Sequence, residues 1–277
     1  DAFVIAPNRL NIADFDFAAA DTACSADLKE LIDQKQLNPS FDGHYNLRQI
    51  FGSQTITDTR YNNPRVWYVQ QQLSDAPAGQ PTDQDLPFIC HPRHKLAIEE
   101  IKQVMSSHYQ NTPFDPYEHD SVPYRSIALN RNLELHILQI RNNVPATIAG
   151  VHWLAFGPNA FNTVVPFYAN VNDTPASYRD TPADYAFGNM YWLTHTIAAI
   201  GDQHYAQARP LVEAYEQKVV AATRQLQRTT DHQVSGDDPK VQLTQANNQM
   251  AEIAMKEATA LLGKLVKIAF GKAKLQY

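Results

Sequence analysis

Few residues of this 277-residue sequence have the types and spacing that catalysis or metal binding requires. Cys24 could act as a nucleophile, but it lies in a predicted helical segment, where a small buried thiol is the more common outcome. His91 and His94 form the closest histidine pair, and Pro92 favours a surface pair over two metal ligands on one helix. Zinc-protease, Walker, dinucleotide-binding and nucleophile-elbow motifs are absent from the sequence. We therefore expect no metal and no cofactor.

Two segments place hydrogen-bond donors at the ends of predicted elements. Ala6–Ile12 ends a strand with the amide of Asn8, which an arginine follows. Tyr61–Trp67 follows a turn with Arg65 at the start of a helix. On spacing alone, asparagine and arginine at such positions are mostly turn and capping residues. Their type and position alone do not assign them a function.

Helical spacing predicts three helices in the first part of the chain, over Asp21–Lys35, Pro64–Leu73 and Leu96–Tyr109. Asp21 and Thr22 are suitable caps for the first of them. A strand and a turn are expected within Asp1–Ile12. The proline-rich segment Ser74–Pro87 is typical of a surface loop.

The hydrophobic period changes to two in the middle of the chain. Apolar and polar residues alternate over Arg125–Arg141, which predicts strands with a turn near Asn130–Asn132. Thr147–Phe156 and Asn162–Tyr168 are rich in aromatic and β-branched residues. These segments predict the buried strands of one antiparallel sheet.

Helical patterns return after Asn170. Three helices are expected, over Tyr185–Ile200, over His204–Arg228 and from Asp238-Pro239 onward, where proline can occupy the first helical position. Thr229–Gly236 is predicted as the loop between the last two. Strands in the middle with helices before and after indicate the α+β class, with an antiparallel sheet, flanking helices and long helices at the end.

The composition excludes several classes of protein. The net charge is −6, and no basic stripe is present that could neutralise nucleic-acid phosphates. No apolar run approaches the roughly 20 residues that span a bilayer. With two cysteines, a disulfide framework is not expected, which favours a reducing compartment. We therefore expect no nucleic-acid partner, no membrane span and a cytoplasmic location.

The sequence resembles the C-terminal part of the dipeptidase A family of lactic acid bacteria, cytosolic thiol dipeptidases related to the secernins. The resemblance covers essentially the whole chain, and the order and spacing of several segments carry it. These segments are Ala6–Ile12, Tyr61–Trp67, Arg125–Ile127 with Leu138–Arg141, and Trp153–Gly157 with Val165–Tyr168.

The resemblance implies an N-terminal-nucleophile hydrolase, in which two stacked antiparallel sheets lie between helical layers. The catalyst of such an enzyme is a mature N-terminal cysteine, whose thiolate attacks the peptide carbonyl while its α-amine carries the proton. Similarity to the wider amidase superfamily suggests Asn8 as the amide donor to the oxyanion. The same similarity suggests Arg65 as the arginine in the nucleophile's pocket, where its charge favours the thiolate.

The family's nucleophile is expected upstream of this chain, which begins at Asp1 in an apolar segment. Neither Cys24 nor Cys90 can present a free α-amine, so neither matches it. We therefore expect residues 1–277 to be the C-terminal portion of one dipeptidase domain, inactive by itself. Within it, residues 1–170 are expected to mix helices and antiparallel strands, and residues 171–277 to be mainly helical.

The expected substrate is a small peptide, and the expected assembly is a homo-oligomer. Two other functions remain open on the sequence. One is a binding or regulatory protein without peptidase activity, which the secernin side of the resemblance permits. The other is an amidase that acts on non-peptide acyl amides through the same groups.

Overall fold

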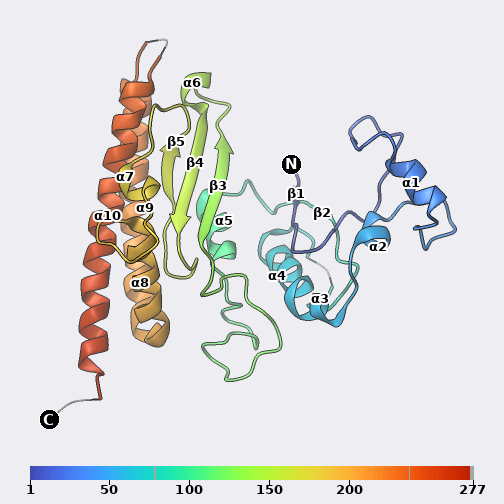
Figure 1. Cartoon of the computed structure of the whole chain (residues 1–277), viewed down its shortest axis with the longest axis horizontal. Helices are drawn as coiled ribbons and strands as arrows, with labels where there is room; N and C mark the ends of the chain where they lie inside the picture. Colours follow the sequence, from blue (N-terminus) through green and yellow to red (C-terminus); the bar gives the residue numbers. More distant parts are fainter. Residues whose placement is uncertain (78, 237, 275–277) are drawn as a thin grey trace. The chain divides into compact units, whose positions relative to one another are not determined.

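The computed structural model describes residues 1–77, 79–236 and 238–274, and the chain divides into two compact units (Figure 1). Unit 1 comprises Asp1–Val104 and His108–Ile127, and unit 2 comprises Met105–Ser107 and the residues from Ala128 onward.

Unit 1 consists of short helices joined by irregular segments, with one pair of two-residue strands. β1 (Phe3–Val4) pairs antiparallel with β2 (Ile89–Cys90), and Phe3 lies opposite Cys90. The helices are α1 (Leu28–Gln34), α2 (Leu47–Phe51), α3 (Ile56–Tyr61), α4 (Asn63–Leu73) and α5 (Ile98–Met105). A small apolar cluster of Val69, Leu73 and Val104 packs with Phe3, Ile5, Leu96 and Ile127.

Local sequence signals explain why α3 and α4 begin where they do. Thr55 and Asp58 form a capping box, in which the Thr55 backbone N–H donates to the Asp58 carboxylate over 2.9 Å. Pro64 lies in the first turn of α4, where its missing N–H costs no helical hydrogen bond. The start of α4 is thereby fixed, and Arg65 lies in its first turn.

Unit 2 is built on one antiparallel sheet with the strand order β3–β4–β5 (Figure 1). β3 (Glu134–Ile140) pairs with β4 (Gly150–Phe156) over its full length, and β4 pairs with β5 (Val165–Tyr168). Gly157 follows β4 with a φ of +80°, and a Cβ atom there would lie 2.9 Å from Thr194 Oγ1. The chain can therefore leave β4 in this direction only with glycine.

Long helices cover this sheet (Figure 1). The helices of unit 2 are α6 (Ala146–Ala149), α7 (Ala176–Arg179), α8 (Met190–Gln203), α9 (Tyr205–Gln233) and α10 (Lys240–Gly271). Trp153 of β4 is fully buried, and the Arg224 guanidinium of α9 lies 4.7 Å from its ring centroid. The Asn247 side chain of α10 accepts from the Tyr168 N–H over 2.9 Å and donates to the Tyr168 carbonyl over 3.0 Å. It thereby satisfies the backbone of the outer strand β5.

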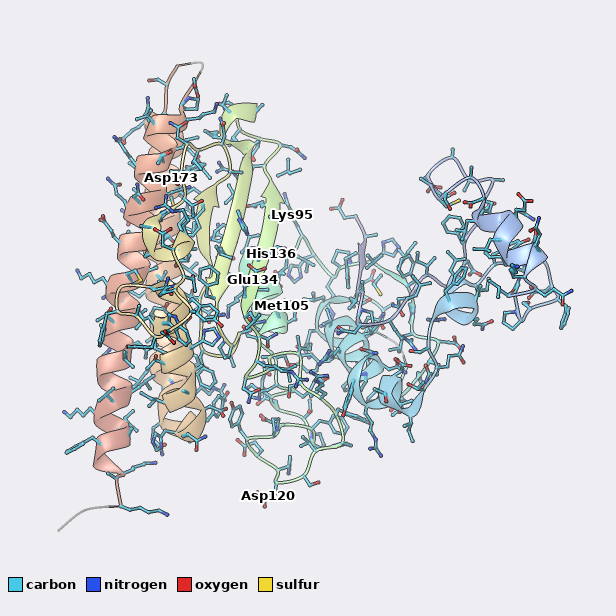
Figure 2. All side chains as sticks on the ribbon, in the orientation of Figure 1. Lys95, Met105, Asp120, Glu134, His136 and Asp173 are labelled. Carbon is cyan, nitrogen blue, oxygen red and sulfur yellow. The ribbon has the colours of Figure 1, made fainter. Side chains whose placement is uncertain are left out.

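The opposite outer strand, β3, leaves apolar side chains exposed. Leu138 and Ile140 are 72% and 79% exposed. Glu134 and His136, labelled in Figure 2, are two residues apart on β3 and therefore share a face of the strand. His136 Nδ1 lies 2.6 Å from the Glu134 carboxylate. Beside them on β4, burial lowers the pKa of His152, and the charge of His136 lowers it further.

The α+β class predicted from the sequence is confirmed by these antiparallel sheets and by the long helices at the end of the chain. The first predicted helix, however, begins later than expected. α1 starts at Leu28 rather than near Asp21, because Thr22 donates its hydroxyl to the Asp16 carbonyl in a turn. Cys24 therefore precedes the helix and is exposed, so the prediction of a buried thiol is wrong.

Two further element predictions are wrong in part. The turn near Asn130 is present, since the Asn132 N–H donates to the Leu129 carbonyl over 3.1 Å. Within Arg125–Arg141, however, the structure has one strand, β3, after this turn and no strand before it. α9 also extends through Gln233 into the predicted loop. Its last turn is held by Asp231, which pairs with Arg141 at the end of β3. Contacts between residues far apart in the sequence, such as that of Asp231 with Arg141, decide where these elements begin and end.

The short helices α2 and α3 were not predicted, because each is too brief to show a helical period. Among the described residues, no helix has the length and apolar character needed to cross a bilayer.

Candidate functional site

Asn8 lies in the irregular segment that follows β1 and is exposed. Its neighbours hold this segment in place. Arg9 donates from Nη1 to Gln84 Oε1 over 2.6 Å and from Nη2 to the Gln84 carbonyl over 2.9 Å. The Asn11 side chain donates to the Ile5 carbonyl over 3.1 Å. The amide of Asn8 is thus presented to solvent by a backbone that its neighbours fix on both sides.

Arg65 is half-buried in the first turn of α4, in the same unit. Its Nε donates to the Ser126 carbonyl over 3.2 Å. Burial raises the pKa of the nearby Tyr109 hydroxyl, and the positive charge of Arg65 opposes that increase. A guanidinium at the positive end of a helix can stabilise an adjacent anion such as a thiolate.

Buried amide side chains surround the start of α4. Asn62 donates to the Asp58 carboxylate over 2.7 Å, Asn63 to the Thr82 carbonyl over 3.3 Å, and Gln70 to the Pro87 carbonyl over 2.7 Å. The carbonyl oxygens of these three amides are buried and have no hydrogen-bond partner among the described residues. They can therefore accept hydrogen bonds from N–H or O–H groups.

Sequence reasoning did not single out these amides as functional residues. Asn62 and Asn63 belong to Tyr61–Trp67, the segment that supplied Arg65, and this was the only available signal for them. Gln70 lies one helical turn or more beyond Arg65, and no local pattern distinguishes it.

Charged groups influence Arg9, the residue next to Asn8. Burial lowers the pKa of Arg9, and the charge of Arg48 lowers it further, while Asp58 and Asp85 oppose the decrease. Arg48 is buried and donates to the Asp85 carboxylate over 2.8 Å. The positive charge of Arg48 thus acts on Arg9 in opposition to the two carboxylates, of which Asp85 is itself paired with Arg48.

The two cysteines differ from each other in environment. Cys24 is exposed in the segment before α1. Cys90, in β2, is 6% exposed, and burial raises the pKa of its thiol, although a hydrogen bond with Gln70 opposes the increase. A raised pKa disfavours the reactive thiolate, so Cys90 is poorly suited to be a nucleophile.

The histidines that stood out in the sequence have separate partners. His91 Nδ1 lies 2.9 Å from the Asp1 carbonyl, and His94 Nε2 lies 2.7 Å from the Glu100 carboxylate. Within the described part of the chain, no group of three or more histidine, cysteine, aspartate or glutamate side chains has the arrangement of a metal site.

Arg141, in another of the segments that carry the resemblance, has a structural role. It donates to the Asp231 carboxylate from both Nη atoms, over 2.6 and 3.0 Å, and the Tyr168 hydroxyl donates to the same carboxylate over 2.7 Å. This group joins β3 and β5 to α9. The two site residues suggested by the resemblance, Asn8 and Arg65, both lie in unit 1.

The family model for "Peptidase family C69" matches residues 1–218 of the chain. The chain belongs to peptidase family C69. The matched range contains both Asn8 and Arg65, all of unit 1, and the sheet of unit 2.

Similar curated proteins carry dipeptidase names. This C69 chain is 48% identical to "Probable dipeptidase B" of Lactococcus lactis subsp. lactis (strain IL1403) and 46% identical to "Dipeptidase A" of Lactobacillus helveticus, each over 286 residues. It is 36% identical over 283 residues to "Probable dipeptidase" of Latilactobacillus sakei. Each alignment covers 100% of this chain and 60% of the relative, so the chain spans less than two thirds of the relatives' length.

Proposed function

We propose that this chain is the C-terminal part of a cysteine-type dipeptidase, which hydrolyses small unblocked peptides with a thiol nucleophile located outside the chain. The observation that carries the proposal is the identity of 46–48% with two dipeptidases along the whole chain. The environment of the cysteines agrees with it, because Cys90 is buried with a raised pKa and neither cysteine has a free α-amine.

The roles of the two candidate residues follow from the chemistry of acyl transfer. The thiolate attacks the scissile carbonyl carbon, and the carbonyl oxygen becomes an oxyanion that accepts a hydrogen bond from the Asn8 amide. When this intermediate collapses, the C–N bond breaks, the leaving amine takes a proton from the α-amino group of the nucleophile, and a thioester remains. Water then hydrolyses the thioester to the free carboxylic acid and the thiol. Arg65 keeps the attacking sulfur in its thiolate form.

Dipeptide hydrolysis by the full-length protein tests the proposal. The full-length protein is expected to hydrolyse a panel of unblocked dipeptides and to lose this activity after alkylation with iodoacetamide. The 277-residue chain alone is expected to show no turnover, since it lacks the nucleophile. Turnover by this chain that Cys24→Ser or Cys90→Ser abolishes would contradict the proposal. Hydrolysis of simple acyl amides without dipeptide hydrolysis would favour an amidase instead.

Arg65 provides a separate test of the thiolate. In the full-length protein, Arg65→Ala is expected to move the acid limb of the pH–rate profile upward, because the thiol pKa rises when the neighbouring positive charge is lost. Arg65→Lys is expected to be poorly tolerated, since an ammonium cannot replace the planar guanidinium. An unchanged pH–rate profile for Arg65→Ala would contradict this role.

We further propose a cytoplasmic location and a homo-oligomeric assembly. The exposed Leu138 and Ile140 of β3 support an assembly, because an outer strand with apolar side chains readily associates. Sedimentation of the full-length protein is expected to show a species larger than one chain. A monomer at high concentration would contradict the proposal.

A further inference from the structure

One surface segment of unit 1, Gly79–Pro87, is hydrogen-bonded to both of the regions that carry the candidate site residues. On one side, Gln84 accepts two hydrogen bonds from Arg9, the residue next to Asn8. On the other side, the Thr82 and Pro87 carbonyls accept from amide side chains of α4, the helix of Arg65. The loop therefore connects two regions more than fifty residues apart in the sequence.

The loop reaches Asn8 through the neighbouring residue Arg9. The backbone bends at Asn8 and Arg9, so the two residues belong to one local turn of the chain. Asn8 is exposed, whereas Arg9 is half-buried and reaches the loop. Because Arg9 ties this bend to the loop, it also fixes the backbone that carries the exposed Asn8 amide.

Several interactions fix the conformation of the loop Gly79–Pro87. Its Asp83 carboxylate accepts from the Gln80 N–H over 2.7 Å, and Gly79 turns the chain with a φ of +78°. Leu86 is buried, and its carbonyl accepts from the buried Arg48 of α2 over 3.3 Å. The segment thus has an internal turn, an apolar contact and a bond to a third element.

We infer that the loop Gly79–Pro87 is a positioning element that sets the Asn8 amide relative to α4 and Arg65, with Arg9 as its positioning residue on the Asn8 side. This inference rests on the proposed function, because it assumes that the Asn8 amide acts in catalysis. Arg9 does not contact substrate in this inference and acts only through Asn8.

A double-mutant cycle in the full-length protein tests the inference, with kcat and KM measured on one dipeptide. Arg9→Lys keeps the charge but loses the planar pair of donors. It is expected to lower kcat about 10- to 100-fold with little change in KM, because a misplaced catalytic group costs rate rather than binding. In the Asn8→Ala background, Arg9→Lys is expected to have almost no further effect on kcat. Gln84→Ala is expected to lower kcat less than Arg9→Lys does, since the backbone carbonyl of residue 84 still accepts from Arg9.

Arg93→Lys is the matched control. Like Arg9, Arg93 donates two hydrogen bonds within unit 1, here to the Ser74 and Gln71 carbonyls, and neither acceptor lies in the loop Gly79–Pro87 or in the Asn8 segment. Its replacement is expected to leave kcat within about twofold and to change the melting temperature about as much as Arg9→Lys does.

The outcomes separate the two hypotheses. If Asn8→Ala leaves kcat intact, the role of Asn8 in the proposed function is wrong, and the inference fails with it. If Asn8→Ala lowers kcat but Arg9→Lys lowers it by the same factor in both backgrounds, the positioning inference alone is wrong. A loss of kcat in Arg93→Lys equal to that in Arg9→Lys would also overturn it, because the effect would then be general destabilisation.

Discussion

Units 1 and 2 are held together by different kinds of interaction. In unit 2, regular elements bury a continuous apolar layer around Trp153, and strand pairing satisfies most of the backbone of the sheet. In unit 1, much of the backbone is irregular, and long side chains such as Arg9, Arg48, Gln70 and Arg93 donate to its carbonyls. The candidate site residues lie in unit 1.

The comparison shows which interactions hold single groups in place in this chain and which interactions stabilise its fold. An irregular segment cannot satisfy its own backbone groups, so each carbonyl needs a particular side chain as its partner. Such a segment can hold a functional group in one position, but its conformation depends on individual side chains. The apolar layer of unit 2 spreads its stabilisation over many contacts.

The largest effect is expected from the centre of unit 2. Trp153→Ala should lower the free energy of unfolding by about 3–5 kcal/mol, because it leaves a large cavity in a fully buried site and removes the contact with Arg224. Urea unfolding of this chain measures it. Val241→Ala, at an exposed position of α10 in the same unit, is the control and should change the free energy by less than about 0.5 kcal/mol. Similar losses for both variants would contradict the assignment of the core.

The next largest effect is expected on catalysis rather than on stability. In the full-length protein, Asn8→Ala should lower kcat about 10²- to 10³-fold, the cost of one lost oxyanion donor, with KM nearly unchanged. Because Asn8 is exposed, the melting temperature should stay the same. A plain turn role would give the reverse pattern, with a lower melting temperature and an intact kcat/KM.

A smaller loss of stability is expected from the polar network of unit 1. The Asp58 carboxylate accepts from Ser53, from the Thr55 N–H and from Asn62. Asp58→Ala should cost about 2–3 kcal/mol, since it removes the cap of α3 and leaves these donors without an acceptor. Hydrogen exchange in α3 measures the loss, and amides in β4 serve as the internal control. Equal loss of protection in both places would contradict the separation of the two units.

The same carboxylate gives unit 1 an acid sensitivity. Burial acts to raise the pKa of Asp58, but the hydrogen bonds from Asn62, Ser53 and Thr55 outweigh it and lower the pKa overall. A lowered pKa stabilises the fold above the unfolded pKa of about 3.9, and this stabilisation is lost as the pH falls through the folded pKa. In Asp58→Ala, acidification should therefore reduce the protection of the α3 amides from hydrogen exchange less than it does in the unchanged chain.

The smallest effect is expected from His152 in unit 2. Its pKa is lowered in the folded chain, so the unfolded chain binds the proton more readily. The contribution of neutral His152 to the free energy of unfolding should be fully present above about pH 6.5. It should decrease as the pH falls from there through the folded pKa. Urea unfolding from pH 8 to pH 5 measures this slope, which His152→Gln should reduce. His44→Gln, at an exposed position of unit 1, should leave it unchanged.

The sequence predicted the parts of the fold that repeat a simple period. α4 was predicted to within one residue, because Pro64 marks its start and its apolar residues follow a helical spacing. Both long helices at the end were predicted from the same helical spacing, whereas β4 and β5 were predicted from their aromatic and β-branched residues. The site residues came from a resemblance, since Asn8 and Arg65 have no distinctive spacing of their own. Their roles stay predictions.

What the sequence alone determined is the α+β class, the long helices and the family, because hydrophobic periods and ordered motifs are local or linear properties of the chain. Tertiary structure decided that β3 pairs with β4, that α9 continues to Asp231 and beyond, and that Cys24 is exposed. It also decided which residues surround the site, since Arg9 and Gln84 are 75 residues apart and meet only in the fold. A contact between irregular segments follows no hydrophobic period, so no pattern in the sequence predicts it.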